Sequence, residues 1–276
     1  MKEEIYRTVC PGCGIGCGLY IREDEQGKVS VDFLKSSPVN LGKLCRFGMK
    51  LPNYYSGSTS SMLDGQECDT EDSVKAAASR LKGADKVAML SVGNTTCEEQ
   101  MAFAKLAETL GTLVHTGIDT YNEIPPEYYS YLDGESLENL EEASKIVLFV
   151  DPYVQYPLLV RKLLAAKQKG AHITAVGTAE LHLANETKNL SPEHYEELGL
   201  DNDSVIITDV HLHTNKDHVR QLLNLSLDTG AKIHFIKPFV NSEGANRLVE
   251  DKAKVCSIPQ ILDEIEEGNI KTLFLL

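Results

Sequence analysis

The sequence predicts an α/β protein in which a small cysteine-rich N-terminal domain is attached to a larger, Rossmann-like body with a parallel sheet. Two observations lead to this prediction. Four of the seven cysteines fall within the first 45 residues, and from about residue 70 onward strand-sized apolar runs alternate with segments of helical periodicity. We place the N-terminal domain at residues 1–58 and the body at residues 59–276, and expect the body to divide into two sublobes near residues 135–200.

In the N-terminal domain the sequence predicts short strands. Apolar and polar residues alternate in Gly18–Ile21 and Val29–Phe33, on either side of a polar turn. A short helix should follow Cys45 and end before Pro52, because proline interrupts the hydrogen bonds of a helix interior. Residues 54–65 are polar and are expected to form a linker.

The body is expected to begin with a helix over residues 70–83, with Val74 on its apolar face. A buried strand at residues 87–92 and a second helix at residues 97–109 follow, and Met101 is expected to face inward. Further strands are predicted at residues 146–150, 173–176, 204–208, 232–236 and 272–276, and further helices at residues 158–168, 192–198, 216–227 and 259–267. Strands that alternate with helices in this way indicate parallel βαβ units.

The composition argues against two classes of partner. With 41 Asp and Glu against 27 Lys and Arg, the formal net charge of -14 is unfavourable for binding nucleic acid. The longest apolar runs, such as Ile146–Val150, are far shorter than the about 20 residues that cross a bilayer. The first residues also lack the apolar core of a secretion signal. We therefore expect no nucleic-acid binding, no direct membrane span and a cytoplasmic location.

The N-terminal cysteines have the spacing of iron–sulfur ligands. Cys10, Cys13 and Cys17 lie within eight residues and Cys45 follows after a gap of 27, which gives the pattern C-x2-C-x3-C-x27-C. The glycines between them permit tight turns, and amide N–H groups of such a loop can point at cluster sulfurs. The pattern predicts a [4Fe–4S] cluster on these four cysteines. Three further residues are expected to set its potential through hydrogen bonding, burial and local charge: Gly14, Ile15 and Arg46.

Two other chemistries remain open for these cysteines. A structural zinc ion also accepts four cysteines, but usually from two C-x2-C pairs, whereas the second half here offers only Cys45. A redox dithiol of Cys10 and Cys13 would normally lie at a strand-to-helix turn inside a βαβ unit. The remaining cysteines are interpreted as ordinary buried residues: Cys68, Cys97 and Cys256.

Residues 9–17, together with Leu44–Gly48, resemble the N-terminal Fe–S domain of the molybdopterin oxidoreductase family. Within the family the resemblance is greatest to one component of formylmethanofuran dehydrogenase, through Thr96–Gln100 among other segments, and it extends to Asn241–Asn246. This resemblance implies a [4Fe–4S] domain on an α/β body. It also implies a place in an anaerobic redox complex beside other Fe–S, flavin, hydrogenase or dehydrogenase proteins.

The chain departs from this family where the family binds its metal–pterin cofactor. Alignment with the family places Tyr121 at the position of the Cys or selenocysteine that binds molybdenum or tungsten, and Asp151 beside the expected pyrophosphate. Gly177 and Ala179 replace a guanine-reading Asp and an Arg, and Phe47 replaces a basic residue. The sequence also stops where active members continue into a further cofactor-binding domain. Molybdopterin guanine dinucleotide is therefore not expected.

We favour an electron-transfer subunit that carries one [4Fe–4S] cluster without its own molybdenum- or tungsten-pterin, and that is not catalytic by itself. One alternative is the Fe–S and central part of a catalytic formate or formylmethanofuran dehydrogenase. The other is an architectural subunit in which the cluster only stabilises the fold.

A second group of polar residues follows the strand expected at residues 204–208, where α/β proteins often place functional groups: Asp209, His211, His213 and His218. An H-x-H pair can bind zinc or nickel, but hydrogen-bonded or solvent-facing histidines are the simpler interpretation. No phosphate-binding G-x-G-x-x-G or Walker A loop follows a predicted strand, and no G-x-S-x-G elbow occurs.

Overall fold

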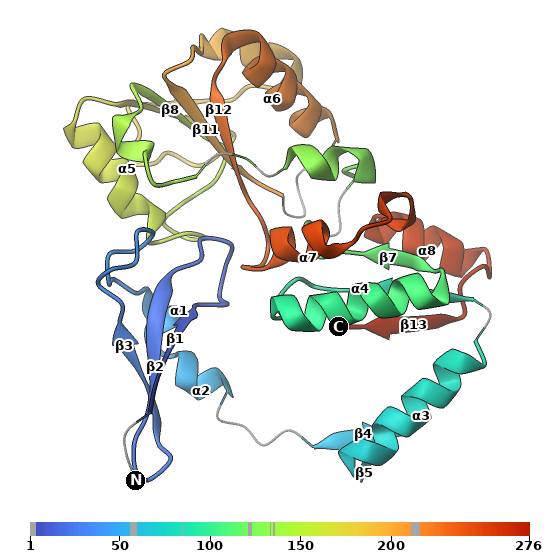
Figure 1. Cartoon of the computed structure of the whole chain (residues 1–276). Coiled ribbons are helices and arrows are strands. Elements are labelled where there is room, and N and C mark those ends of the chain that lie inside the picture. The colour runs from blue at the N-terminus through green and yellow to red at the C-terminus, as the bar shows by residue number, and fades with distance from the viewer. Residues whose placement is uncertain are drawn as a thin grey trace.

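Four sheets make up the β-structure that the computed structural model describes. The description covers residues 4–55, 60–84, 86–120, 123–132, 134, 136–210 and 216–276. Two of the four sheets are parallel and lie in the body, as Figure 1 shows, so the predicted α/β class with a parallel-sheet body is confirmed. The predicted domain boundary at residues 58 and 59 lies outside the described residues, and it stays a prediction together with the sublobe division near residues 135–200.

The N-terminal lobe is an antiparallel three-stranded sheet with two short helices. Its strands β1 (Glu4–Val9), β2 (Gly18–Glu23) and β3 (Val29–Phe33) pair in the order β1-β2-β3, as expected for this segment. The helices are α1 (Arg46–Met49) and α2 (Leu51–Tyr55). Pro52 does not end the helical segment, because it lies in the first turn of α2, where a missing N–H group costs nothing.

The lobe leads into a hairpin and a helix that pack mainly on one another. The hairpin strands β4 (Ser61–Leu63) and β5 (Gln66–Cys68) pair antiparallel, so part of the expected linker is a strand. Helix α3 (Thr70–Lys82) contacts β4, and Figure 1 shows both set apart from the body. Among its described residues α3 buries none, and Val74 is exposed, so the expected inward apolar face is wrong.

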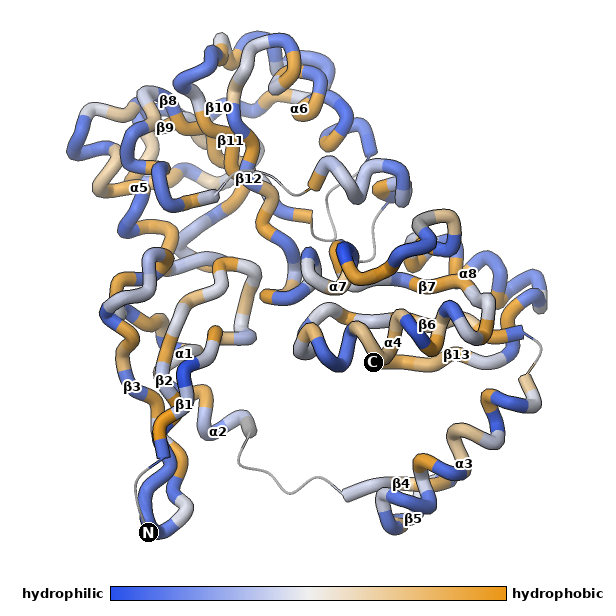
Figure 2. Tube along the Cα trace, viewed as in Figure 1, coloured by the Kyte–Doolittle hydropathy of each residue, from blue (hydrophilic) through white to orange (hydrophobic). Residues whose placement is uncertain are grey.

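A five-stranded parallel sheet forms the centre of the body, in the order β10-β9-β8-β11-β12. Its strands are β8 (Lys145–Leu148), β9 (His172–Val176), β10 (Glu186–Lys188), β11 (Ser204–Asp209) and β12 (Lys232–Ile236). Helices α5 (Leu159–Gln168) and α6 (Lys216–Thr229) cover it, and side chains alternate between two apolar clusters: Ile146 packs with Leu163 of α5, and Val147 packs with Leu222 of α6. The core strands are accordingly hydrophobic in Figure 2.

The second parallel sheet is smaller and has the order β13-β6-β7. Its strands are β6 (Val87–Leu90), β7 (Leu113–His115) and β13 (Thr272–Leu275), and the neighbouring helices are α4 (Cys97–Leu110), α7 (Ser242–Leu248) and α8 (Ile258–Glu266). Met101 of α4 is exposed, contrary to expectation, because the buried stripe of this helix runs through Phe103 and Ala107, four residues apart. The remaining turns are 3-10 helices: η1 (Pro126–Tyr131), η2 (Leu140–Glu142), η3 (Pro192–Leu198), where an α-helix was expected, and η4 (Lys252–Lys254).

The N-terminal lobe lies at the carboxyl end of the five-stranded sheet. The chain enters this sheet at β8, continues outward through β9 and β10, and then returns to add β11 and β12 on the other side, so the strand order reverses between β8 and β11. In open α/β sheets the crevice at such a reversal is where ligands bind. The loops after β8 and β12 both reach the lobe, which places the predicted cysteine site at this end of the sheet.

Candidate iron–sulfur site

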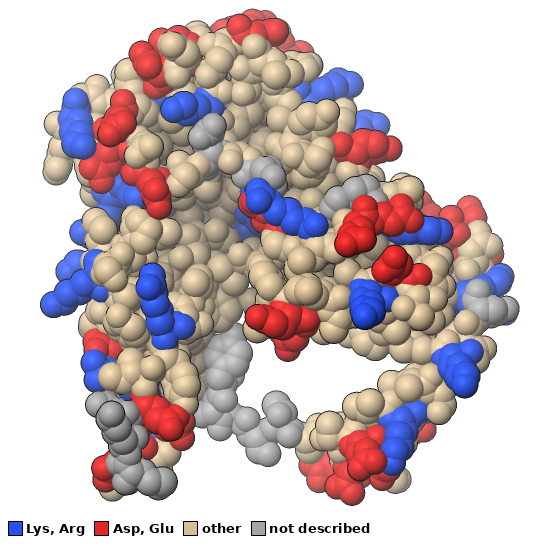
Figure 3. Space-filling model, in the orientation of Figure 1, with Lys and Arg blue, Asp and Glu red and all other residues tan. Residues whose placement is uncertain are grey.

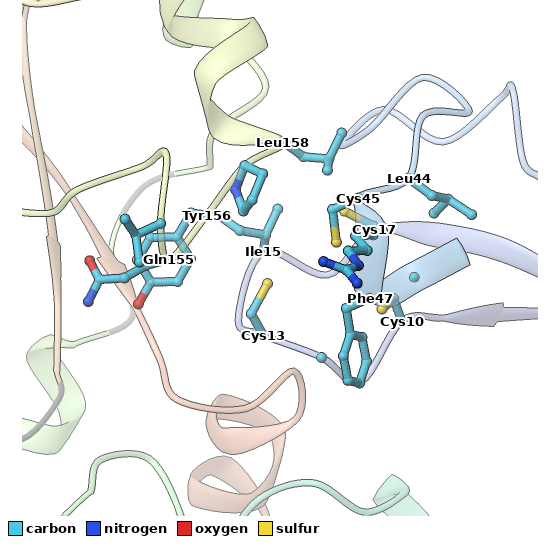
Figure 4. A pocket seen from close by; sticks show the side chains of 15 residues that line it. Cys10, Cys13, Ile15, Cys17, Leu44, Cys45, Phe47, Gln155, Tyr156 and Leu158 are labelled. Carbon is cyan, nitrogen blue, oxygen red and sulfur yellow. The ribbon is translucent and has the colours of Figure 1, made fainter. Parts of the chain in front are cut away.

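The end of the β1–β2 hairpin brings three of the predicted ligands together. Cys10 directly follows β1 and Cys17 directly precedes β2, and the amide of Cys10 donates to the carbonyl of Cys17 at 2.8 Å. Cys13 lies in the turn between them, and Cys45 is the residue that precedes the first turn of α1. All four cysteines line one cavity of about 210 Å³, shown in Figure 4.

Two glycines allow the cysteine loop to take this path. Gly16 has a φ of 72°, in the left-handed region that favours glycine. A Cβ atom on Gly14 would overlap the carbonyl oxygen of Lys237, which follows β12. Gly14 therefore contributes close contact between the lobe and the body rather than a turn of its own.

The local electrostatics disfavour bare thiolates in the cavity. Burial raises the pKa of Cys10 and Cys13, and raises the pKa of Cys17 to about 12. The amides of Gly12 and Ile15 oppose this by donating to the sulfurs of Cys10 and Cys13, and so lower the pKa of these two thiols in part. A bound cation would supply the missing positive charge, and metal binding would release the thiol protons.

The arrangement of the sulfurs fits a cluster better than a zinc ion. Within the described parts of the chain, no three Cys, His, Asp or Glu side chains come close enough together to hold a single metal ion. Zinc requires its sulfur ligands at about 2.3 Å from one point, whereas each cysteine of a [4Fe–4S] site binds a different iron. Four thiols spread around one cavity are the donor set of such a cluster.

The body closes the cavity with a segment that the sequence did not identify. Residues Val154–Leu158, in the loop after β8, line the same cavity as the cysteines. Figure 4 shows Tyr156 and Leu158 across the cavity from Cys45. The hydroxyl of Tyr156 donates to Asp209 Oδ2 at 3.1 Å, and this bond spans the crevice between β8 and β11. Burial, with the negative charge of Asp209, raises the pKa of Tyr156, so its hydroxyl keeps its proton.

The predicted tuning residues occupy different environments. Ile15 is buried and its amide points at Cys13, whereas the side chain of Arg46 lies at the exposed start of α1. The next residue, Phe47, stacks on Tyr54 with ring centroids 4.7 Å apart, and it also lines the cavity. The effect of Arg46 on the potential stays a prediction.

The second predicted polar group does not come together as a metal site in the described residues. His211 and His213 lie outside them, as does Tyr121. His218 is buried and uses both ring nitrogens, with Nδ1 2.7 Å from the hydroxyl of Tyr195 and Nε2 2.9 Å from the hydroxyl of Thr208. Burial lowers the pKa of His218 to about 4, as expected for a neutral core histidine.

The altered positions near the expected cofactor have structural roles of their own. Asp151 Oδ1 accepts the amide of Tyr153 at 2.9 Å and so stabilises the turn that leads to Tyr156. Gly177 turns the chain after β9 with a φ of 66°. Of the other cysteines, Cys256 is buried as expected, whereas Cys97 is exposed at the start of α4 and its thiol donates to Asn241.

The family model described as the molybdopterin oxidoreductase Fe4S4 domain matches residues 3–57. This match confirms the predicted kind of N-terminal domain, one that carries a [4Fe–4S] cluster. No helix in the described ranges is both long and apolar enough to cross a membrane.

Similarity to known proteins extends well beyond this domain. The chain is 26% identical over 192 residues to the F420-dependent formate dehydrogenase subunit alpha of Methanocaldococcus jannaschii, covering 64% of this chain and 28% of that protein. It is 29% identical over 190 residues to the nitrate reductase of Klebsiella oxytoca, covering 62% and 22%. The acetylene hydratase from Pelobacter acetylenicus aligns in structure with a TM-score of 0.46 and 11% identity, over 66% of this chain and 29% of that one. The chain thus spans less than a third of the length of these relatives.

Proposed function

We propose that this chain is an iron–sulfur electron-transfer subunit of a larger anaerobic redox complex. Its four ligands would be Cys10, Cys13, Cys17 and Cys45. The observation that carries the proposal is that these cysteines, from two separate segments, line one cavity enclosed between the lobe and the body. When bound, a [4Fe–4S] cluster stores and releases one electron at a time.

The surrounding residues have definable tasks in such a site. The amides of Gly12 and Ile15 would donate to the sulfurs of Cys10 and Cys13, which favours the more negative, reduced state. Val154–Leu158 limit the access of water, since they close the cavity from the side of the body. Burial and hydrogen bonds to sulfur are two of the factors that set a cluster potential.

The body supports a protein that carries electrons rather than one that binds a metal–pterin. The Tyr156–Asp209 bond spans the crevice where a nucleotide would be expected, and the carboxylate of Asp151 is used by its own turn. These contacts occupy polar groups that a cofactor would otherwise need. Bound molybdopterin guanine dinucleotide is therefore not part of the proposal.

We infer the partner classes from the similarity to dehydrogenase and reductase proteins. They are other Fe–S, flavin, hydrogenase or dehydrogenase proteins, in line with the resemblance to formylmethanofuran dehydrogenase. The net charge of -14 would favour solubility and selective association within such a complex.

A potentiometric titration of anaerobically purified protein, followed by EPR, tests this function. We expect a single one-electron transition within the range of iron–sulfur clusters, about −700 to +450 mV. A cluster that keeps one oxidation state over this whole range would contradict electron transfer and would favour the architectural role.

A second candidate function is a piece of a catalytic molybdenum or tungsten enzyme that acts on formate or a formyl group. The observation in its favour is that the similarity to a formate dehydrogenase runs over 192 residues, far beyond residues 3–57. Stoichiometric pterin in the purified protein would decide for it.

A further inference from the structure

Charge is unevenly distributed around the cysteine cavity. Residues 33–63, which include the lining residues Leu44–Gly48, contain four Lys and Arg and not one of the 41 acidic residues. Residues 152–179, which include the lining residues Val154–Leu158, also contain four Lys and Arg and no acid. These two segments hold 59 residues, in which the average frequency of 41 in 276 would place about nine acids. The cavity thus lies in a cationic region of an acidic protein.

Several of these cations lie at the mouth of the cavity on the surface. Lys43, Arg46 and Lys50 are exposed in and beside α1, and Arg161 is exposed in the first turn of α5, three residues after Leu158. Figure 3 shows Lys and Arg side chains on the flank where the N-terminal lobe meets the five-stranded sheet.

Apolar side chains are exposed among these cations. Val154, at the mouth of the cavity, is 78% exposed, and Met49 and Tyr54 are also exposed. Tyr54 stacks on Phe47, which itself lines the cavity, so an aromatic pair connects the site with the surface. An apolar centre with a charged rim is the usual composition of a protein docking surface. We define the cavity rim as Lys43, Arg46, Met49, Lys50, Tyr54, Val154 and Arg161.

We propose that the cavity rim docks an acidic one-electron carrier protein with an exposed iron–sulfur or flavin centre. This rests on the proposed function. One electron would pass between the carrier and the cluster in either direction, so that one partner is oxidised by one electron as the other is reduced, and no covalent bond changes. The apolar residues would exclude water between the centres, while the cations would pair with carboxylates of the carrier.

The overall charge of the chain adds orientation to this docking. An acidic carrier is repelled by most of the surface, but at physiological salt the Debye length of about 8 Å screens the distant acids. Cations in contact range are screened far less, so the rim is the favoured point of approach. Charge complementarity of this kind mainly affects association rate and specificity.

The test uses the anaerobic, cluster-loaded protein and a purified acidic [4Fe–4S] ferredoxin as the probe. We expect saturable binding that weakens with salt, and a loss of about tenfold or more in affinity for the double variant Lys43→Glu with Lys50→Glu. The matched control is Lys105→Glu with Lys232→Glu, an equal charge change at exposed positions of α4 and β12. We expect the control to change affinity by less than about twofold. Val154→Asp should also weaken binding, through lost apolar contact.

Absence of saturable binding at low salt, or equal losses in the two double variants, would overturn the docking surface. Unchanged iron content and EPR signal in each variant establish that the fold and cluster persist. Reduction by a small viologen dye separates the two proposals, because a dye needs no docking surface. If the dye reduces the protein and the ferredoxin does not bind, electron transfer stands and the docking surface is wrong. If the dye also fails, the proposed function itself is contradicted.

Discussion

Each buried cysteine of the cavity destabilises the fold as a free thiolate and stabilises it as an iron ligand. The pKa of Cys17 is raised to about 12 by burial, so this thiol loses its proton only to a bound metal. We expect Cys17→Ser to lose iron and the EPR spectrum of a four-iron cluster, and to lower thermal stability. Cys97→Ser is the matched control, because Cys97 is exposed and should leave iron content unchanged. Equal iron in both variants would contradict the ligand assignment.

His218 makes stability depend on pH in a defined direction. Its pKa is lowered to about 4 by burial, while an unfolded histidine titrates near about 6.5. The unfolded state therefore binds more protons between these values, so stability falls as pH falls through this window. The loss due to His218 between pH 7 and pH 5 is about 2 kcal/mol.

Urea unfolding of His218→Gln at pH 7 and at pH 5 checks this prediction. The variant should be less stable at pH 7, since the contacts to Tyr195 and Thr208 change, but should lose about 2 kcal/mol less between pH 7 and pH 5 than the unaltered chain. His194→Gln, at an exposed site, should keep the full slope. An unchanged slope in His218→Gln would show that this histidine is not the source.

At the scale of elements, the contact between the cysteine loop and the end of β12 depends on Gly14. A Cβ atom there meets backbone rather than a movable side chain, so Gly14→Ala must shift either the loop or the strand end. We expect a loss of about 1–3 kcal/mol and faster proteolysis of the N-terminal lobe. Gly83→Ala is the control, since the nearest atom to its Cβ is 3.6 Å away. Similar losses in both would argue against the contact.

The elements themselves were largely predictable from periodicity. The parallel strands and helices of the body follow apolar runs and helical spacing, and the observed bounds differ from expectation by a few residues. The failures have local causes. The run of apolar residues in α4 offered two faces, and packing selected Phe103 over Met101. The segment after Pro52 remains helical because proline is tolerated in a first turn.

The site was predictable only in part, for a reason that concerns the whole molecule. The four cysteines share a recognisable spacing, so their sequence identifies them. The cover of the cavity by Val154–Leu158 and the Tyr156–Asp209 bond depend on strand order, because they join loops after β8 and β11. Neighbouring strands of a sheet need not be neighbours in sequence, and one sequence does not determine that order.

The central claim concerns the whole molecule: the chain carries one iron–sulfur cluster and no metal–pterin centre. The most direct test is to measure iron, acid-labile sulfide, molybdenum, tungsten and pterin on one anaerobically purified sample. We predict about four iron and about four sulfide per chain, with no molybdenum, tungsten or pterin above background. Stoichiometric molybdenum or tungsten together with pterin would contradict the claim and identify the chain as part of a catalytic oxidoreductase.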